Sequence, residues 1–293
     1  MTEQYDQDYL DGLNFSLKGE IQQAINCWMK AAAKGNAQAM YHIGEAYDFR
    51  LHDFFKAKKW YWKAIRNHNT DALVAIAIWY RYGRYVKESY RSAIIFNQRA
   101  ARCGNARAMM ELHELYYFGN GKKKNHPKSL YWLKRSAALG NDFAIESLAG
   151  MYLEGYGGVK KDFSQALFWY RKLADSSWDA NDTLADLYFF GEQYGKGSYQ
   201  WQYDFETNTC WLDDNIRGMV LLDIFDAENQ SISNALYWYR RFARRDNIAA
   251  IRKLKYLYQH GLIVKKNQAQ AKYWNNLAIE AQKRVEIFCP WRL

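Results

Sequence analysis

The chain of 293 residues repeats one motif about every 36 residues, and this repetition limits its fold more than any other feature. Each copy opens on a small residue, and mostly apolar residues follow three, seven and eight positions later. The opening residues are Ala24, Ala57, Ala93, Ser129, Ala166, Ala235 and Ala271. They lie 33 to 37 residues apart, except for one gap of 69 before Ala235. A repeat of this length cannot bury its own apolar face, so the period indicates a stack of repeats.

Within each copy the pattern predicts two helices joined by a short turn. The spacing of apolar residues after the opening residue is typical of one helix face. A turn such as Gly35-Asn36, Gly104-Asn105 or Gly140-Asn141 follows, because glycine readily adopts the left-handed conformation that ends a helix. A second stripe then places a small residue, Leu or Ile, and an aromatic at intervals of four, as in Ala108, Leu112 and Tyr116. We therefore predict an all-α fold, an α/α superhelical solenoid of helix-turn-helix repeats.

The gap of 69 residues is close to twice the period, so we predict a diverged repeat inside it rather than a separate domain. Residues 192–234 hold eight acids and two bases, a local charge of −6, whereas the rest of the chain carries +16. The predicted organisation is a single solenoid over residues 1–293 with about seven to eight repeats. Residues 192–234 form its degenerate, acidic repeat, and residues 285–293 form a C-terminal tail.

The cysteines and the amino end favour a reducing compartment such as the bacterial cytoplasm. Cys27, Cys103, Cys210 and Cys289 form no close pairs that would staple a local loop. The first residues are acidic and lack the basic start and apolar run of a secretory signal. The longest strongly apolar stretch, residues 72–80, is far shorter than the roughly 20 residues that cross a bilayer. We expect a cytoplasmic protein with no membrane span.

The repeat resembles the Sel-1-like repeat, a relative of the tetratricopeptide repeat. The fullest copy reads LAGMYLEG over residues 148–155 and YGGVKKD over residues 156–162, and the resemblance covers residues 19–278. It implies a right-handed superhelix whose first helices line a concave surface used as an adaptor. Members assemble complexes in degradation, cell-envelope and signalling pathways, and some bacterial ones are immunity proteins that block secreted toxins, including lipase-type effectors. The copy at Ala57 departs from the pattern, since His68 replaces the turn glycine.

Two features of the first helices exceed the family pattern and give the candidate binding residues. Aromatic rings stand two residues after the opening residue in four copies, and in three of them a base follows four residues later, on the same helix face. The densest basic run lies close to one of these rings. The candidates are Tyr131, Arg135, Phe168, Lys172, Tyr237, Arg240, Arg241, Arg244, Arg245 and Tyr273. Exposed Tyr and Arg are common interface hot spots. The alternatives are that the rings pack between helices and that the basic run is a solvated face.

These features favour a module that binds a protein partner over an enzyme. The six histidines show no metal-ligand spacing, and neither a phosphate-binding glycine loop nor a serine nucleophile motif occurs. We therefore expect no cofactor, no metal and no catalytic residue. The net charge of +10 favours an acidic partner surface, and a secreted toxin is the specific partner that the resemblance implies. Nucleic-acid binding is the less favoured alternative, because the acidic copy interrupts the basic track, and a regulatory scaffold in envelope or stress signalling is the third. The sequence leaves the oligomeric state open.

Overall fold

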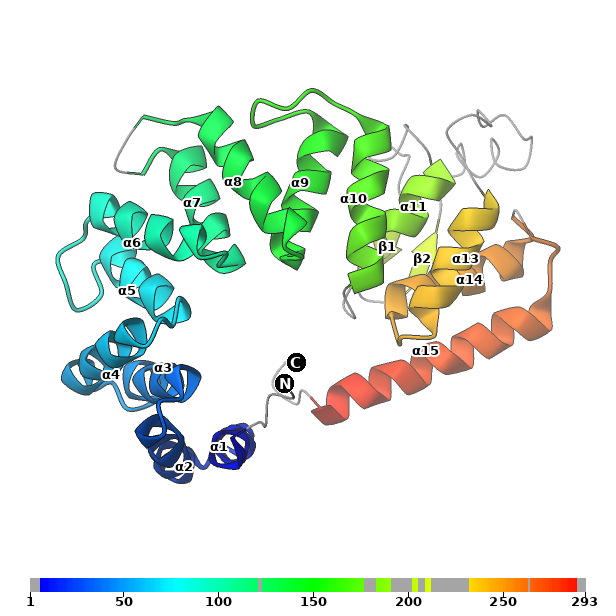
Figure 1. Cartoon of the computed structure of the whole chain (residues 1–293). Helices are drawn as coiled ribbons and strands as arrows, with labels where there is room; N and C mark the ends of the chain where they lie inside the picture. The colour runs from blue at the N-terminus through cyan, green and yellow to red at the C-terminus, as the bar shows by residue number, and fades with distance from the viewer. Residues whose placement is uncertain are drawn as a thin grey trace, which may run out of the picture. The chain divides into compact units, whose positions relative to one another are not determined.

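The computed structural model describes residues 6–120, 123–176, 183–190, 202–204, 209–211, 232–262 and 264–288, and nearly all of them are helical (Figure 1). By its contacts the chain divides into two compact units where the sequence predicts a single solenoid. The first unit is Met1–Leu148 with Tyr156–Val159, and the second is Ala149–Gly155 with Lys160–Leu293. Each unit is a succession of helix pairs, as predicted.

The first unit contains α1 to α8 and the beginning of α9. Their bounds are α1 Gln7–Leu17, α2 Ile21–Ala33, α3 Ala37–Glu45, α4 Phe54–Arg66, α5 Asp71–Tyr82, α6 Tyr90–Arg102, α7 Ala106–Phe118, α8 His126–Ala138 and α9 Asp142–Glu154. A single π-helical turn, η1 (Ala46–Arg50), continues α3.

The second unit contains the end of α9, α10 Phe163–Ser176, α11 Thr183–Phe190, α13 Ile232–Ala243, α14 Ile248–His260 and α15 Gln268–Phe288. It also holds two short antiparallel strands, β1 Gln202–Asp204 and β2 Thr209–Trp211. α15 continues to Phe288, so the predicted tail at 285–293 begins as helix, and residues 289–293 lie outside the described residues.

The turns inside the helix pairs explain the Gly-Asn signature. Gly35 and Gly104 have φ values of 91° and 85°, in the left-handed region that ends a helix without a steric penalty only for glycine. The next residue caps the following helix: the Asn36 side chain accepts a hydrogen bond from the Ala39 amide, and Asn105 does the same for Ala108. One dipeptide therefore both ends the first helix and starts the second.

The opening small residues form the centre of the stack. Ala24, Ala57, Ala93, Ala166 and Ala235 have no exposed surface. A side chain of this size lets two helix backbones approach closely, and large rings such as Tyr61 and Tyr239 fill the remaining space in each unit.

Buried polar contacts join helices that lie far apart in the sequence. In the second unit the Lys253 ammonium on α14 lies 2.7 Å from Asp186 Oδ2 on α11, and the Tyr239 hydroxyl on α13 donates to Asp186 Oδ1 at 2.7 Å. Lys253 and Asp186 are both almost inaccessible to solvent. These groups hold α11, α13 and α14 in one register.

The acidic segment joins α11 to α13 in the chain, and these two helices pack directly on each other. α13 contacts α11 directly, as α4 contacts α3 and α6 contacts α5, so no helix pair separates them (Figure 1). At residues 202–204 and 209–211 the structure has strands rather than the predicted helix, and β2 lies against α14. Residues 192–201, 205–208 and 212–231 of this segment lie outside the described residues, and residues 232–234 begin α13. Its assignment as a diverged repeat stays a prediction.

Replacing His68 by glycine should stabilise the first unit. His68 has a φ of 64° and its amide bonds to the carbonyl of Ile65, the geometry that Gly104 adopts toward Ala101. A left-handed non-glycine residue costs about 1–2 kcal/mol, and the entropy that glycine loses on folding offsets part of the gain. We expect His68→Gly to raise the free energy of unfolding by about 0.5–1 kcal/mol in urea titrations.

Gly104→His is the matched control for that change, because a Cβ at Gly104 would meet no atom within 4 Å and only the backbone conformation is tested. It should lower the free energy of unfolding. A stabilising effect of Gly104→His, or a destabilising effect of His68→Gly, would contradict this account of the turns.

Removing one partner of the buried ion pair should destabilise the second unit strongly. Lys253→Met leaves the Asp186 carboxylate buried without its ammonium, and breaking a buried pair in this way costs about 3–5 kcal/mol. The double variant Asp186→Leu with Lys253→Met should recover much of that loss, since no charge is then stranded. Thermal and urea unfolding of the three proteins measures both effects; equal losses in the single and double variants would refute the role of the pair.

Candidate interaction groove

The four predicted rings lie on the surface. Tyr131, Phe168, Tyr237 and Tyr273 are 53%, 57%, 55% and 56% exposed. A tryptophan follows each of them and is better buried; Trp238 next to Tyr237, for example, is only 6% exposed and meets it edge to face at 5.3 Å between ring centroids. The alternative that the four rings pack between helices therefore does not hold. The tryptophans take that place.

The bases four residues after the rings adopt different contacts. Arg135 on α8 donates from Nη1 to the Tyr131 hydroxyl at 3.1 Å, as the spacing predicts. On α10 the Lys172 ammonium lies 5.3 Å from the centre of the Trp169 ring. On α13 the Arg241 guanidinium lies 4.8 Å from the centre of the Trp238 ring, and its Nη1 lies 3.2 Å from Asp175 Oδ1 on α10. Arg241 thus serves mainly to join two helices of the second unit.

Two adjoining hollows of the second unit collect most of the predicted arginines. One, of about 460 Å³, is lined by Ser233, Tyr237, Arg240, Arg241 and Arg244. The other, of about 860 Å³, lies along α13, α14 and α15. Its lining comprises Arg240, Ala243, Arg244, Asp246, Tyr258, Asn267, Gln270, Tyr273, Trp274, Leu277 and Arg284. Because Arg240 and Arg244 line both, we treat the two hollows as one feature and call it the arginine groove.

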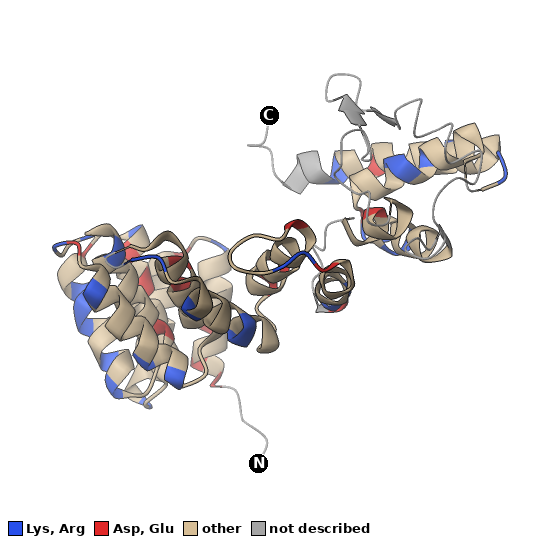
Figure 2. Cartoon of the chain, turned by 90° about the horizontal axis from the view of Figure 1, so that it is seen from above, with Lys and Arg blue, Asp and Glu red and all other residues tan. Residues whose placement is uncertain are grey.

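The groove carries a surplus of positive charge. Arg240 donates from Nη2 to the Tyr258 hydroxyl at 2.6 Å, a contact that leaves its charge uncompensated. Arg284 pairs with Asp246, the one acid in the lining, at 2.9 Å. Among the described residues the Arg244 guanidinium has no hydrogen-bond or ion-pair partner. Two guanidinium groups therefore stand available to an anionic ligand at the junction of the two hollows. More widely, Lys and Arg recur along the helices of both units (Figure 2).

Three of the predicted residues lie elsewhere in the second unit, and two lie in the first. Arg245 is half-buried and donates from Nη1 to the Ala174 carbonyl oxygen at 3.4 Å, so it supports the contact of α13 with α10 instead of lining the groove. Phe168 and Lys172 are on α10, and Tyr131 and Arg135 are on α8 in the first unit. None of these five lines either hollow.

Sequence reasoning missed Tyr258, Gln270 and Arg284, which complete the groove. Tyr258 occupies the aromatic position of the second-helix stripe, after Ala250 and Leu254, whereas the candidate residues were taken from the first helices alone. Arg284 comes late on α15, beyond the last recognisable motif. Leu277 and Arg284 follow Tyr273 by four and eleven residues, so helical periodicity along α15 would have placed both on the same helix face as Tyr273.

The described residues offer no group of three His, Cys, Asp or Glu side chains close enough to hold a metal. No described helix is long and apolar enough to cross a membrane. The lining of the arginine groove offers guanidinium, phenol and amide groups, which suit recognition of an anionic surface.

Comparison with known proteins identifies the repeats. A model of the Sel1 repeat matches residues 9–36, 37–69, 70–105, 106–141, 143–177, 228–247 and 248–282. The unmatched interval, 178–227, falls between α10 and α13 and contains α11 and the hairpin. A search of curated proteins found no match.

Solved structures share the fold. A Sel1 repeat protein from Oxalobacter formigenes is 26% identical, with a TM-score of 0.59, and the likeness covers 93% of this chain and 99% of that one. A protective antigen of uropathogenic Escherichia coli that displays an SLR fold is 24% identical, with a TM-score of 0.50, covering 91% of this chain and 60% of that one. An immunity protein from Pseudomonas aeruginosa is 19% identical over 70% of this chain and 78% of that one, with a TM-score of 0.47, too weak a likeness for inference.

The helix pairs and the seven matched segments confirm the predicted class, an α/α solenoid of helix-turn-helix repeats. The chain belongs to the Sel1 repeat family.

Proposed function

We propose that this protein is an interaction module that binds an acidic segment of a protein partner in the arginine groove. The observation that carries the proposal is the pair Arg240 and Arg244, placed at the junction of two hollows between the exposed rings of Tyr237 and Tyr273. Sel1 repeats are interaction scaffolds as a family, which supports a protein as the ligand. The proposal assigns no catalytic step.

The groups of the groove match carboxylates. A guanidinium presents two parallel N–H donors at the spacing of carboxylate oxygens, and such charge-assisted pairs are about twice as strong as neutral hydrogen bonds. Tyr237 and Tyr273 add apolar area with a polar tip, and Gln270 and Asn267 offer further hydrogen bonds along the same wall. An acidic partner segment with an apolar side chain would use all three kinds of contact.

A toxin is the specific partner we favour, with this protein acting as its immunity protein in the bacterial cytoplasm. Support comes from family membership and from chemistry: an inhibitor must hold its target tightly, and two guanidinium groups with flanking tyrosines form a typical hot-spot composition. Among the described cysteines, Cys27 and Cys103 are both unpaired, which fits a reducing compartment.

Neutralising the two central arginines should weaken partner binding by at least about tenfold, which corresponds to about 1.4 kcal/mol. The partner is first identified by affinity purification from the source organism and mass spectrometry. Its dissociation constant is then measured with wild type, with Arg240→Gln plus Arg244→Gln, and with Tyr237→Ala, which should also weaken binding. All three side chains are exposed, so the melting temperature should not change.

Arg102→Gln is the matched control, because Arg102 is also an exposed arginine near a helix end but lies on α6, outside the groove. Equal losses for this control and the groove variants would reduce the effect to net charge and refute the groove. Tighter binding of DNA or RNA than of any protein, with affinity falling steeply as salt increases, would instead establish the nucleic-acid alternative. For the toxin version, failure of the protein to rescue cells that express the purified partner would exclude immunity.

A further inference from the structure

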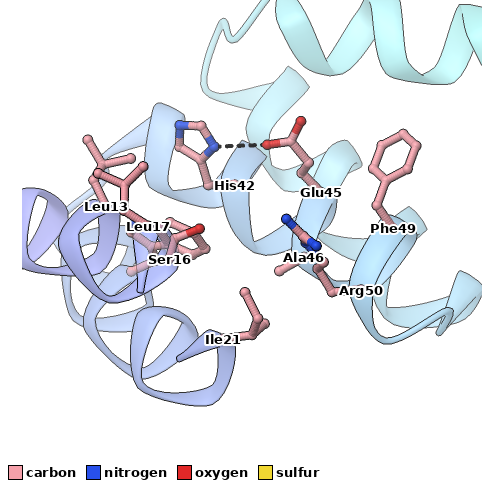
Figure 3. Close-up of a pocket in the computed structure, with 10 residues that line it drawn as sticks. Leu13, Ser16, Leu17, Ile21, His42, Glu45, Ala46, Phe49 and Arg50 are labelled. Carbon is pink, nitrogen blue, oxygen red and sulfur yellow. Dashed lines mark hydrogen bonds and ion pairs between the residues drawn. The ribbon is translucent and has the colours of Figure 1, made fainter. Parts of the chain in front are cut away.

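A separate hollow lies at the amino end of the first unit. It has a volume of about 520 Å³ and is formed by α1, α2, α3 and η1 (Figure 3). We call it the N-terminal pocket. Figure 3 shows Leu13, Ser16 and Leu17 of α1 on one side and Ala46 and Arg50 on the other, with Glu45 and Phe49 beside them. All of its lining lies in residues 13–50, so it shares no residue with the arginine groove.

One part of the pocket is apolar and open to solvent. Leu17 is 87% exposed and Phe49 is 49% exposed, and both line it together with Leu13, Ile21 and Ala46. Apolar side chains that gather at the mouth of a hollow mark a place where another apolar group is taken up.

Another part carries two groups of opposite charge. Arg50 has no hydrogen-bond, ion-pair or ring partner among the described residues. Glu45 accepts a hydrogen bond from the Tyr41 hydroxyl at 3.2 Å and lies 3.1 Å from His42 Nδ1. The hydrogen bond to His42 is the main reason why the pKa of Glu45 lies below its usual value. The pocket thus offers a cation and a carboxylate whose remaining lone pairs can accept from a ligand.

Contacts behind the pocket hold these groups in place. His42 stacks on Trp28 with ring centroids 5.3 Å apart, and its Nε2 lies 3.2 Å from the Tyr9 hydroxyl. α1 approaches Trp28 closely because residue 12 is glycine: a Cβ there would lie 2.4 Å from the indole ring.

The π-helical turn is anchored from its other side. Asp48, which is almost fully buried, accepts from Trp79 Nε1 at 2.9 Å and from the Tyr61 hydroxyl at 3.3 Å, and Arg84 Nη2 lies 3.1 Å from its Oδ1. The turn that carries Phe49 and Arg50 is therefore fixed before any ligand arrives.

We propose that the N-terminal pocket binds the carboxyl-terminal residue of a polypeptide. The terminal carboxylate pairs with Arg50, the backbone N–H of that residue faces Glu45, and its apolar side chain packs against Leu13, Leu17 and Ile21. Capture of a terminal carboxylate is a recurring mode of peptide recognition.

Other anions match the pocket less well. A fatty acid would satisfy Arg50 and the leucines but carries no N–H donor for the Glu45 carboxylate, which would lose water on binding without gaining a hydrogen bond. An inorganic anion would leave the apolar side unused. Only a ligand with an anion, an N–H donor and an apolar group within one residue uses the whole lining.

The test measures binding of a fluorescein-labelled pentapeptide that ends in leucine with a free carboxylate, by fluorescence anisotropy on the full-length chain. The same peptide with a terminal amide should bind at least about tenfold more weakly, because the ion pair with Arg50 is lost. Arg50→Gln should weaken binding of the free-acid peptide by a similar factor and leave the amide peptide unaffected. Leu17→Ser should weaken both, with no change in melting temperature, since Leu17 is exposed.

Arg66→Gln is the matched control, because Arg66 is an exposed arginine on α4 that does not line the pocket. Equal binding of acid and amide peptides, equal loss in the Arg50 and Arg66 variants, or no peptide binding at millimolar concentration would overturn the proposal. Decanoate is tested as an alternative ligand for the same pocket. Binding of decanoate without binding of the peptide would also overturn the proposal. Because the groove variants leave this pocket intact, its failure and that of the arginine groove are distinguished.

Discussion

The close approach of neighbouring helices at buried small residues is the constraint on which each unit depends. Ala57 and Ala235 have no exposed surface, and a larger side chain at either place would push apart two backbones. A helix pair on its own leaves its apolar face in water, so each repeat is stable only when its neighbour covers it. Large aromatic side chains such as Tyr61 and Tyr239 fill the space between helices that the small alanines do not occupy. The regular period in the sequence therefore gives regularly spaced helix pairs.

This constraint explains how much could be predicted. The alanine spacing and the Gly-Asn turns predict helix bounds because they act locally, through backbone conformation and capping. The period places Tyr237 and Tyr273 at one position of the helix face but does not decide between exposure and packing; the structure shows both rings exposed. Which arginines line the groove could not be predicted from the sequence, because all four belong to one basic run. Arg241 contacts Asp175 and Arg245 contacts Ala174, both on α10, whereas Arg240 and Arg244 line the groove.

The acidic segment lies in a gap of nearly two periods between opening residues. α13 nevertheless packs directly on α11, so helices on either side of a long connection are in contact. The buried network of Asp186, Tyr239 and Lys253 spans this junction. A charged pair costs desolvation and contributes little net stability, but it penalises every register in which one partner is left alone. Such a penalty is most useful where the chain between two packed helices is long and does not itself set their register.

The arginines of this chain divide into those that the fold uses and those that it leaves available. Arg81 lies between Glu111 and Glu114 at 2.6 and 2.7 Å, Arg84 pairs with buried Asp48, and Arg241 pairs with Asp175. Arg50 and Arg244 have no such acids in the described structure, although both line hollows. An exposed guanidinium without an internal acid keeps its charge and its N–H donors for an external anion. The two proposed sites follow from that difference in pairing, which the net charge of the chain does not reveal.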